Sequence, residues 1–183
     1  LNVMEPASRI QHIEEYYFSK KLREIEALRN NGVDIINAGI GSPDLHPHES
    51  VVTALNHALL EPNAHQYQSY KGIPEFRKTI SNWYKNHFRV TLDPEKEILP
   101  LIGSKEGIMH ISLAFLNKGD QVLAPNPGYP TYASASKIVE ADIIHYDLSP
   151  ETNWLPNLAS IEKNNLSKVK IMWINYPHMP TGA

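Results

Sequence analysis

The chain has 183 residues, of which 42% are hydrophobic and 20% are charged, and its formal net charge is -3. This composition is typical of a globular protein of one domain or slightly more, and it offers no basic surface for a nucleic acid. The lack of cysteines excludes a disulfide framework and thiolate metal sites. No stretch approaches the ~20 apolar residues that a membrane span needs, so we expect a cytoplasmic protein.

The first half of the chain is predicted to be largely helical. Three segments repeat apolar residues every three or four positions: residues 13–28, 51–60 and 73–88. An Asn-Asn-Gly sequence ending at Gly32 terminates the first helix, and Pro74 suits the first turn of the third, where no N–H is needed. Gly-Ser-Pro-Asp at 41–44 has no regular period and is predicted to be a loop.

From Asp93 onward, short apolar runs alternate with helical segments. The expected strands are residues 97–102, 121–125, 142–148 and 168–176, and the expected helices are residues 104–116, 131–140 and 158–164. This alternation indicates a largely parallel sheet with helices on both faces. A further helix would be needed after the Pro-Thr-Gly turn at 180–182 to cover the sheet, so we expect the chain to be a truncated part of a larger domain.

The loop after the first expected strand has the composition of an anion site. Gly-Ser-Lys-Glu at 103–106 opens a helix, so backbone N–H groups, a hydroxyl and an ammonium face the carboxyl end of the strand. A phosphate group would fit there. The alternative is an ordinary helix start, with Ser104 as the N-cap and Glu106 in the first turn.

Two other strand-end loops carry candidate binding residues. In Pro-Asn-Pro-Gly-Tyr-Pro-Thr-Tyr at 125–132, three prolines around Gly128 fix the backbone, so Tyr129 is held where it can lie flat on a planar ring. The alternative is a stiff loop with two core tyrosines. The segment 175–183 alone is only a proline-rich turn after a strand. Because ligands gather at strand ends in α/β sheets, the three loops together favour one shared site.

Several motifs follow one another in a fixed order along nearly the whole chain. They are Gly-Ser-Pro-Asp at 41–44, Tyr67 with Gly72 five residues on, Ile-Pro-Glu-Phe-Arg at 73–77, Gly-Ser-Lys-Glu at 103–106, Pro-Gly-Tyr-Pro-Thr-Tyr at 127–132 and Pro-Thr-Gly at 180–182. This order resembles that of fold-type I aminotransferases of classes I and II, which depend on pyridoxal 5'-phosphate. The resemblance implies a three-layer α/β/α fold with a mostly parallel mixed sheet and an N-terminal helical arm. The arm and a small-domain segment would occupy residues 1–46, and the first part of the large cofactor-binding domain residues 47–183.

The resemblance also implies roles for individual residues. Ser104, Lys105 and Glu106 would bind the cofactor phosphate, largely through backbone N–H groups. Tyr129 would stack on the pyridine ring and hold it in plane.

Other implied roles concern the partner subunit and the substrate. Tyr67 matches a tyrosine that reaches the phosphate in the neighbouring subunit, which implies a homodimer with a shared active site. Ile40 and Gly41 match the loop that contacts the substrate carboxylate. Met179 stands where the family usually has an asparagine that bonds the cofactor's ring oxygen, and a thioether donates nothing. His178 beside it could supply a donor, and the alternative is a solvent-facing histidine.

The predicted activity of the parent protein is transfer of an amino group between an amino acid and a 2-oxo acid. In the family, the lysine that holds the cofactor, the aspartate that pairs with its ring nitrogen and the arginine that grips the substrate all lie beyond residue 183, so no catalytic residue is expected within this chain. A carbon–sulfur lyase of the same fold, or a non-catalytic ligand-sensing relative, are the alternatives. No metal site is expected, since no helix carries paired ligands at zinc spacing.

Overall fold

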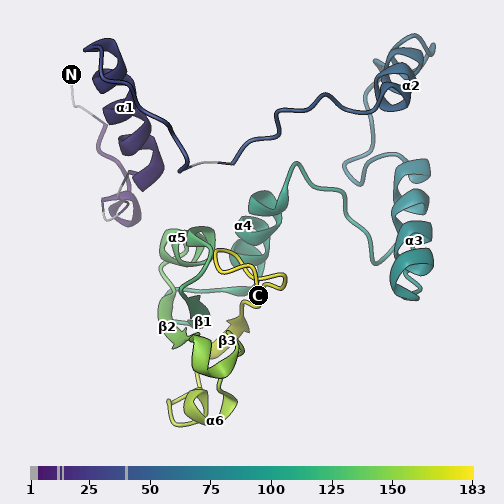
Figure 1. Ribbon diagram of the computed structural model, residues 1–183. Helices are drawn as coiled ribbons and strands as arrows, with labels where there is room; N and C mark the ends of the chain where they lie inside the picture. The colour runs from purple at the N-terminus through teal and green to yellow at the C-terminus, as the bar shows by residue number, and fades with distance from the viewer. Residues whose placement is uncertain (1–3, 12, 14, 40) are drawn as a thin grey trace. The chain divides into compact units, whose positions relative to one another are not determined.

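The computed structural model describes residues 4–11, 13, 15–39 and 41–183 (Figure 1). The chain forms two compact units. The sheet unit consists of Leu101–Ala183 with the described residues among the first 14, and the helical unit is Glu15–Pro100. None of the helices in the described residues combines the length and the apolar character of a bilayer span.

A parallel three-stranded sheet forms the centre of the sheet unit. Its strands are β1 (Gln121–Asn126), β2 (Asp142–Asp147) and β3 (Val169–Met172), in the order β2-β1-β3. The helical elements of this unit are η1 (Ser8–Ile10), α4 (Ser104–Phe115), α5 (Pro130–Ile138), η2 (Pro150–Thr152) and α6 (Leu158–Ile161). Gln121 at the start of β1 lies opposite Asp142 on one side and Val169 on the other, so the carboxyl ends of the strands meet at one edge.

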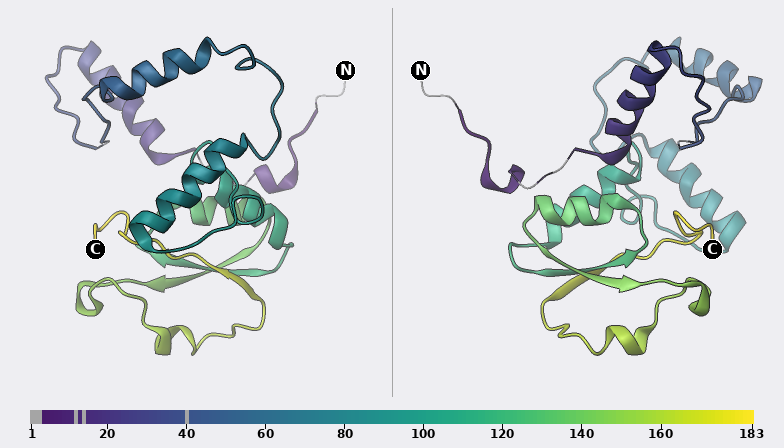
Figure 2. Two further views of the ribbon diagram at one scale, coloured as in Figure 1. Left: turned by 90° about the vertical axis from the view of Figure 1, so that its right-hand side faces the viewer. Right: turned by 60° about the vertical axis from the view of Figure 1, so that its left-hand side comes forward.

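Helices cover both faces of this sheet, with α4 and α5 on one face and α6 on the other (Figure 2). Successive residues of β1 point to opposite faces, as strand geometry requires. Ala124 packs with Ile108 of α4 and with α5. Leu123 packs with Tyr146 and with Ile161 of α6. The three-layer α/β/α arrangement predicted from the sequence is therefore confirmed.

The helical unit contains α1 (Tyr17–Asn30), α2 (Glu49–Leu59) and α3 (Pro74–Phe88). Gly32 adopts a φ of +81°, and the N–H of Val33 returns to the carbonyl of Leu28 at 3.1 Å, which closes α1 as its Asn-Asn-Gly sequence predicts. Pro74 occupies the first turn of α3, also as predicted. These two local signals placed the ends of their helices correctly.

The strand expected over residues 97–102 is not formed, and that prediction is wrong. Within the described residues no strand pairs with this segment. Pro100 also has no N–H group to donate to a neighbouring strand. Leu99 and Ile102 are 58% and 94% exposed. An apolar run becomes a strand only where a neighbour supplies hydrogen bonds. The helix expected at 158–164 and the strand expected at 168–176 exist but are shorter than predicted.

Candidate cofactor site

The start of α4 presents an uncapped helix N-terminus. Gly103 is the N-cap residue, with φ +83° and ψ 160°, and no side chain caps the helix. A left-handed φ favours glycine because a Cβ would be strained there. First-turn N–H groups have no acceptor within their own helix, and the helix dipole adds positive potential at this end. The alternative in which Ser104 is the N-cap is wrong, because Ser104 is already the first helical residue.

The Glu106 carboxylate is hydrogen-bonded to the backbone just before this N-terminus. The N–H of Ile102 donates to Glu106 Oε2 at 2.6 Å. The Glu106 side chain therefore closes the turn that contains Gly103. The acidic side chain in the first turn of α4 is thus hydrogen-bonded within the turn itself. The predicted contact of the Glu106 backbone N–H with a phosphate stays a prediction.

Tyr129 lies next to this helix start. The Lys105 ammonium is positioned over the Tyr129 ring, 5.7 Å from the ring centre. Tyr129 is half-buried, and the edge of its ring meets Tyr132 with centres 5.8 Å apart at 78°. Tyr132 is buried and stacks on Trp173 at 5.2 Å and 14°. Of the two tyrosines, Tyr132 belongs to the core, whereas Tyr129 keeps part of its ring accessible.

The turn before Tyr129 is tightly closed. A Cβ added to Gly128 would lie 2.4 Å from the Pro125 carbonyl oxygen and 2.7 Å from Pro125 Cγ. The first of these atoms belongs to the backbone and cannot rotate away. The Asn126 side chain donates to Asp147 Oδ1 at 2.9 Å and so ties the end of β1 to the end of β2. The Pro-Asn-Pro-Gly-Tyr-Pro sequence itself did not predict this hydrogen bond between Asn126 and Asp147.

The loop after β3 encloses His178. Its side chain is 3% exposed, with Nδ1 2.7 Å from Thr181 Oγ1 and with Nε2 buried, without a partner in the described residues. The solvent-facing alternative is therefore wrong. The side chain of Met179 is 56% exposed, and its N–H donates to Asn175 Oδ1 at 3.1 Å. The inward residue of this pair is thus the histidine, and its predicted cofactor contact stays a prediction.

The remaining predicted residues belong to the helical unit or lie outside the described residues. Tyr67 is fully exposed, at 103% of its reference area. Gly41 is exposed, and a Cβ added there would meet no atom within 4 Å. Ile40 lies outside the described residues. The sheet unit contains the other predicted residues, and within it the structure places Lys105 of the first turn of α4 against Tyr129 at the start of α5. His178 lies in the same unit, in the loop after β3.

A family model for "Aminotransferase class I and II" matches residues 33–183. The chain belongs to this aminotransferase family. An LL-diaminopimelate aminotransferase of Dehalococcoides mccartyi is 43% identical over 180 residues, which are 98% of this chain and 46% of that protein. The enzyme of the same name from Aquifex aeolicus is 42% identical over 181 residues, 99% of this chain and 47% of that protein.

Two solved structures are also similar to this chain. The apo structure of BacF from Bacillus subtilis has a TM-score of 0.91 at 35% identity and covers 99% of this chain and 46% of its own. An alanine aminotransferase from Pyrococcus furiosus has a TM-score of 0.88 at 27% identity, over 98% of this chain and 46% of its own. The chain thus spans about half the length of the relatives it matches. Class I and II aminotransferases depend on pyridoxal phosphate, as the motif order predicted.

Proposed function

We propose that the full-length protein is a pyridoxal-phosphate-dependent aminotransferase that moves an amino group between an amino acid and a 2-oxo acid. The observation that carries this proposal is the contact between Lys105 and Tyr129 at the uncapped start of α4. It joins a helix N-terminus suited to a phosphate with a half-exposed aromatic face suited to a planar ring. Those are the two ends of the cofactor that this family uses.

The residues of this chain fit the cofactor in the following roles. The first-turn N–H groups of α4 and the Ser104 hydroxyl bind the phosphate, and the Lys105 ammonium balances its charge. Tyr129 covers one face of the ring, orients it and excludes water from that face. When bound, pyridoxal phosphate supplies an electron sink for charge that develops on the substrate. His178 braces the adjoining loop through Thr181.

The proposal also covers the organisation of the whole protein. Residues 1–46 would form the arm and a small-domain segment, and residues 47–183 the first part of the large domain. Two subunits would share each active site, with Tyr67 reaching the phosphate of the partner subunit and with Ile40 and Gly41 at the substrate carboxylate. The full exposure of Tyr67 supports a role at a subunit boundary. A cytoplasmic location stays a prediction from composition.

The names of the relatives suggest a first substrate. Relatives 41–43% identical to this chain are named LL-diaminopimelate aminotransferase. We therefore propose LL-diaminopimelate as the first amino donor to test. Donor choice is tested on the full-length protein, because selection of the substrate side chain also uses residues outside this half.

The test uses the full-length protein loaded with pyridoxal phosphate. LL-diaminopimelate and a set of other amino acids are each incubated with a 2-oxo acid, and the new amino acid is quantified by chromatography. We expect matched loss of donor and gain of product. Cofactor binding without turnover of any donor would contradict the proposal and favour the ligand-sensing alternative. Release of a thiol from a sulfur-containing donor, with no new amino acid, would favour the lyase.

A further inference from the structure

Arg77 is a charged side chain buried inside the helical unit. It is 4% exposed, and among the buried residues of the described chain it is the one arginine, lysine or carboxylate residue. Burial of a charge is costly unless every donor finds a partner. The sequence motif at 73–77 contains Arg77 but gave no sign of its burial. The contacts of its guanidinium show why it is held there.

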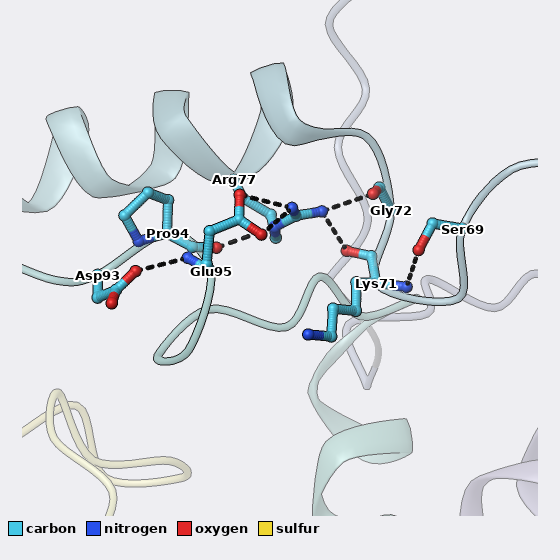
Figure 3. A network of polar contacts seen from close by, with 7 residues as sticks. All are labelled: Ser69, Lys71, Gly72, Arg77, Asp93, Pro94 and Glu95. Atoms are coloured by element: carbon cyan, nitrogen blue, oxygen red, sulfur yellow. Dashed lines mark hydrogen bonds and ion pairs between the residues drawn. The ribbon is translucent and has the colours of Figure 1, made fainter.

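All the donors of the guanidinium are used (Figure 3). Nε donates to the Pro94 carbonyl at 2.9 Å. Nη1 donates to the carbonyls of Lys71 and Gly72 at 3.2 and 2.6 Å. Nη2 donates to both carboxylate oxygens of Glu95 at 2.9 Å each. These five bonds account for the five N–H groups that a guanidinium carries.

The partners of Arg77 belong to two loops, at 66–72 and 92–97. The loop at 92–97 is also held by hydrogen bonds that do not involve Arg77. The N–H of Asp93 donates to Glu97 Oε2 at 2.7 Å, and the N–H of Glu95 donates to Asp93 Oδ1 at 2.8 Å. The hydroxyl of Ser81, also on α3, donates to the Leu92 carbonyl at 2.7 Å. Loss of Arg77 would therefore leave this loop attached to α3.

The loop at 66–72 depends on Arg77 to a much greater degree. Its own bonds are local, such as the N–H of Gly72 to the Ser69 carbonyl at 2.9 Å and the N–H of Lys71 to Ser69 Oγ at 3.3 Å. Within the described part of the chain, the hydrogen bonds that reach this loop from beyond residues 59–72 come from Arg77. This side chain thus attaches the loop to α3.

The attached loop carries exposed aromatic rings. Tyr67 and Tyr70 are 103% and 90% exposed, so neither ring is held by packing within the unit. An exposed side chain on a loop is placed by its backbone, and the backbone here is fixed at Lys71 and Gly72. A ring that must meet a group on another molecule needs such a fixed base, because a displacement of about 1 Å weakens a positioned contact strongly.

We propose that Arg77 is a positioning residue, which fixes the 66–72 loop so that Tyr67 is presented to the cofactor phosphate of the partner subunit. This inference rests on the proposed function, since it assigns Tyr67 its contact across the subunits. Arginine is required because lysine has three donors on a single nitrogen and cannot serve two loops in opposite directions.

The experiment uses the full-length protein and four variants: Arg77→Lys, Tyr67→Phe, the double variant of these, and Ser81→Ala. The dissociation constant of pyridoxal phosphate is measured by absorbance titration, and amide hydrogen exchange is measured over residues 66–72 and 92–97. Ser81→Ala is the matched control, because it removes a bond from α3 to the other loop. If Arg77→Lys does not fold, Glu95→Gln replaces it as a milder perturbation of the guanidinium.

We expect faster exchange over 66–72 in Arg77→Lys and a weaker cofactor affinity by about tenfold, the order expected for one lost hydrogen bond to a charged group. In the Tyr67→Phe background, Arg77→Lys should add no further loss. Ser81→Ala should raise exchange near residue 92 and leave the cofactor affinity unchanged.

The inference is overturned by an equal affinity loss in both backgrounds, by an equal loss in Ser81→Ala, or by an unchanged affinity in Arg77→Lys. Cofactor affinity and hydrogen exchange are measured without catalytic turnover, so they test this inference separately from the proposed activity. A protein that binds pyridoxal phosphate but transfers no amino group contradicts the proposed function alone.

Discussion

The ammonium of Lys105 lies over the aromatic ring of Tyr129, 5.7 Å from the ring centre. One residue comes from the first turn of α4 and the other from the N-terminal end of α5. Cation–π contacts contribute about 0.5–1 kcal/mol at exposed sites. The contact is modest in energy, and it places the first turn of α4 beside the half-buried ring of Tyr129.

Replacement of Tyr129 by leucine is expected to weaken binding of pyridoxal phosphate to the full-length protein by about three- to tenfold, the range for one aromatic stack. Phenylalanine at the same position keeps the aromatic face and should change the affinity by less than about twofold. Absorbance titration with the cofactor measures both values. Equal losses in the two variants would show that the hydroxyl acts instead of the ring face.

Two substitutions of Glu106 are expected to separate the effect of its charge on phosphate binding from the effect of its hydrogen bond on stability. Glu106→Gln keeps an acceptor for the Ile102 N–H and removes a negative charge near the phosphate, so affinity for inorganic phosphate should rise about threefold. Glu106→Ala loses the bond and should lower the free energy of unfolding by about 1 kcal/mol. Calorimetric titration and urea unfolding check the pair. Weaker phosphate binding by Glu106→Gln would place the carboxylate at the ligand.

Gly128 and Gly107 are expected to differ in their tolerance of a methyl group. At Gly128 the new Cβ would meet the Pro125 carbonyl oxygen at 2.4 Å, so the backbone must move. We expect Gly128→Ala to cost at least about 2 kcal/mol of unfolding free energy, as overpacking does. At Gly107 the obstacle is Leu101 Cδ1 at 2.5 Å, in a side chain 44% exposed that can turn away.

Urea unfolding of both variants tests this difference. The helix propensity of alanine over glycine offsets the clash at Gly107 by about 1 kcal/mol, so Gly107→Ala should be near neutral. The displaced backbone at Gly128 should also move Tyr129 and weaken cofactor binding. A loss of unfolding free energy in Gly128→Ala as small as that in Gly107→Ala would mean that the turn before Tyr129 deforms easily and does not hold the ring.

The sequence predicted the parts of the fold that depend on local patterns. The end of α1 at Gly32 and the start of α3 at Pro74 follow from backbone preferences of single residues, which act whatever the surroundings. The loops after β1 and β3 were also found, because turn residues after apolar runs mark them in the sequence, whereas the loop at 103–106 follows a segment that forms no strand. Most of the candidate site consists of such loops.

The features that the sequence did not predict depend on distant partners. The guanidinium of Arg77 is buried because residues up to 18 positions away accept its bonds, and no periodic pattern contains that information. His178 is enclosed by its own loop, where its ring contacts Thr181, and the turn composition around it gave no sign of this burial. Residues 97–102 have the composition of a strand, but ladder bonds come from neighbours.

Tyr146 is expected to make the stability of the sheet unit depend on pH in the alkaline range. Burial raises the pKa of Tyr146 to about 12, and its hydroxyl donates to the Trp173 carbonyl at 2.6 Å. The folded state therefore holds the proton more tightly than the unfolded state, whose tyrosines titrate near pH ~10. The stabilisation is complete below that pH and is lost as the pH rises through about 12.

The comparison of Tyr146→Phe with the unsubstituted protein isolates this effect. At pH 8 the variant should be less stable by about 1 kcal/mol, the usual contribution of one hydrogen bond. As the pH rises from ~10 towards ~12, the difference between the two proteins should shrink, because only the unsubstituted protein loses stability as the Tyr146 hydroxyl ionises. Urea midpoints at a series of pH values measure it, with Tyr70→Phe, at an exposed ring, as the control. A difference that stays constant over this range would show that Tyr146 ionises in the folded protein as readily as in the unfolded chain.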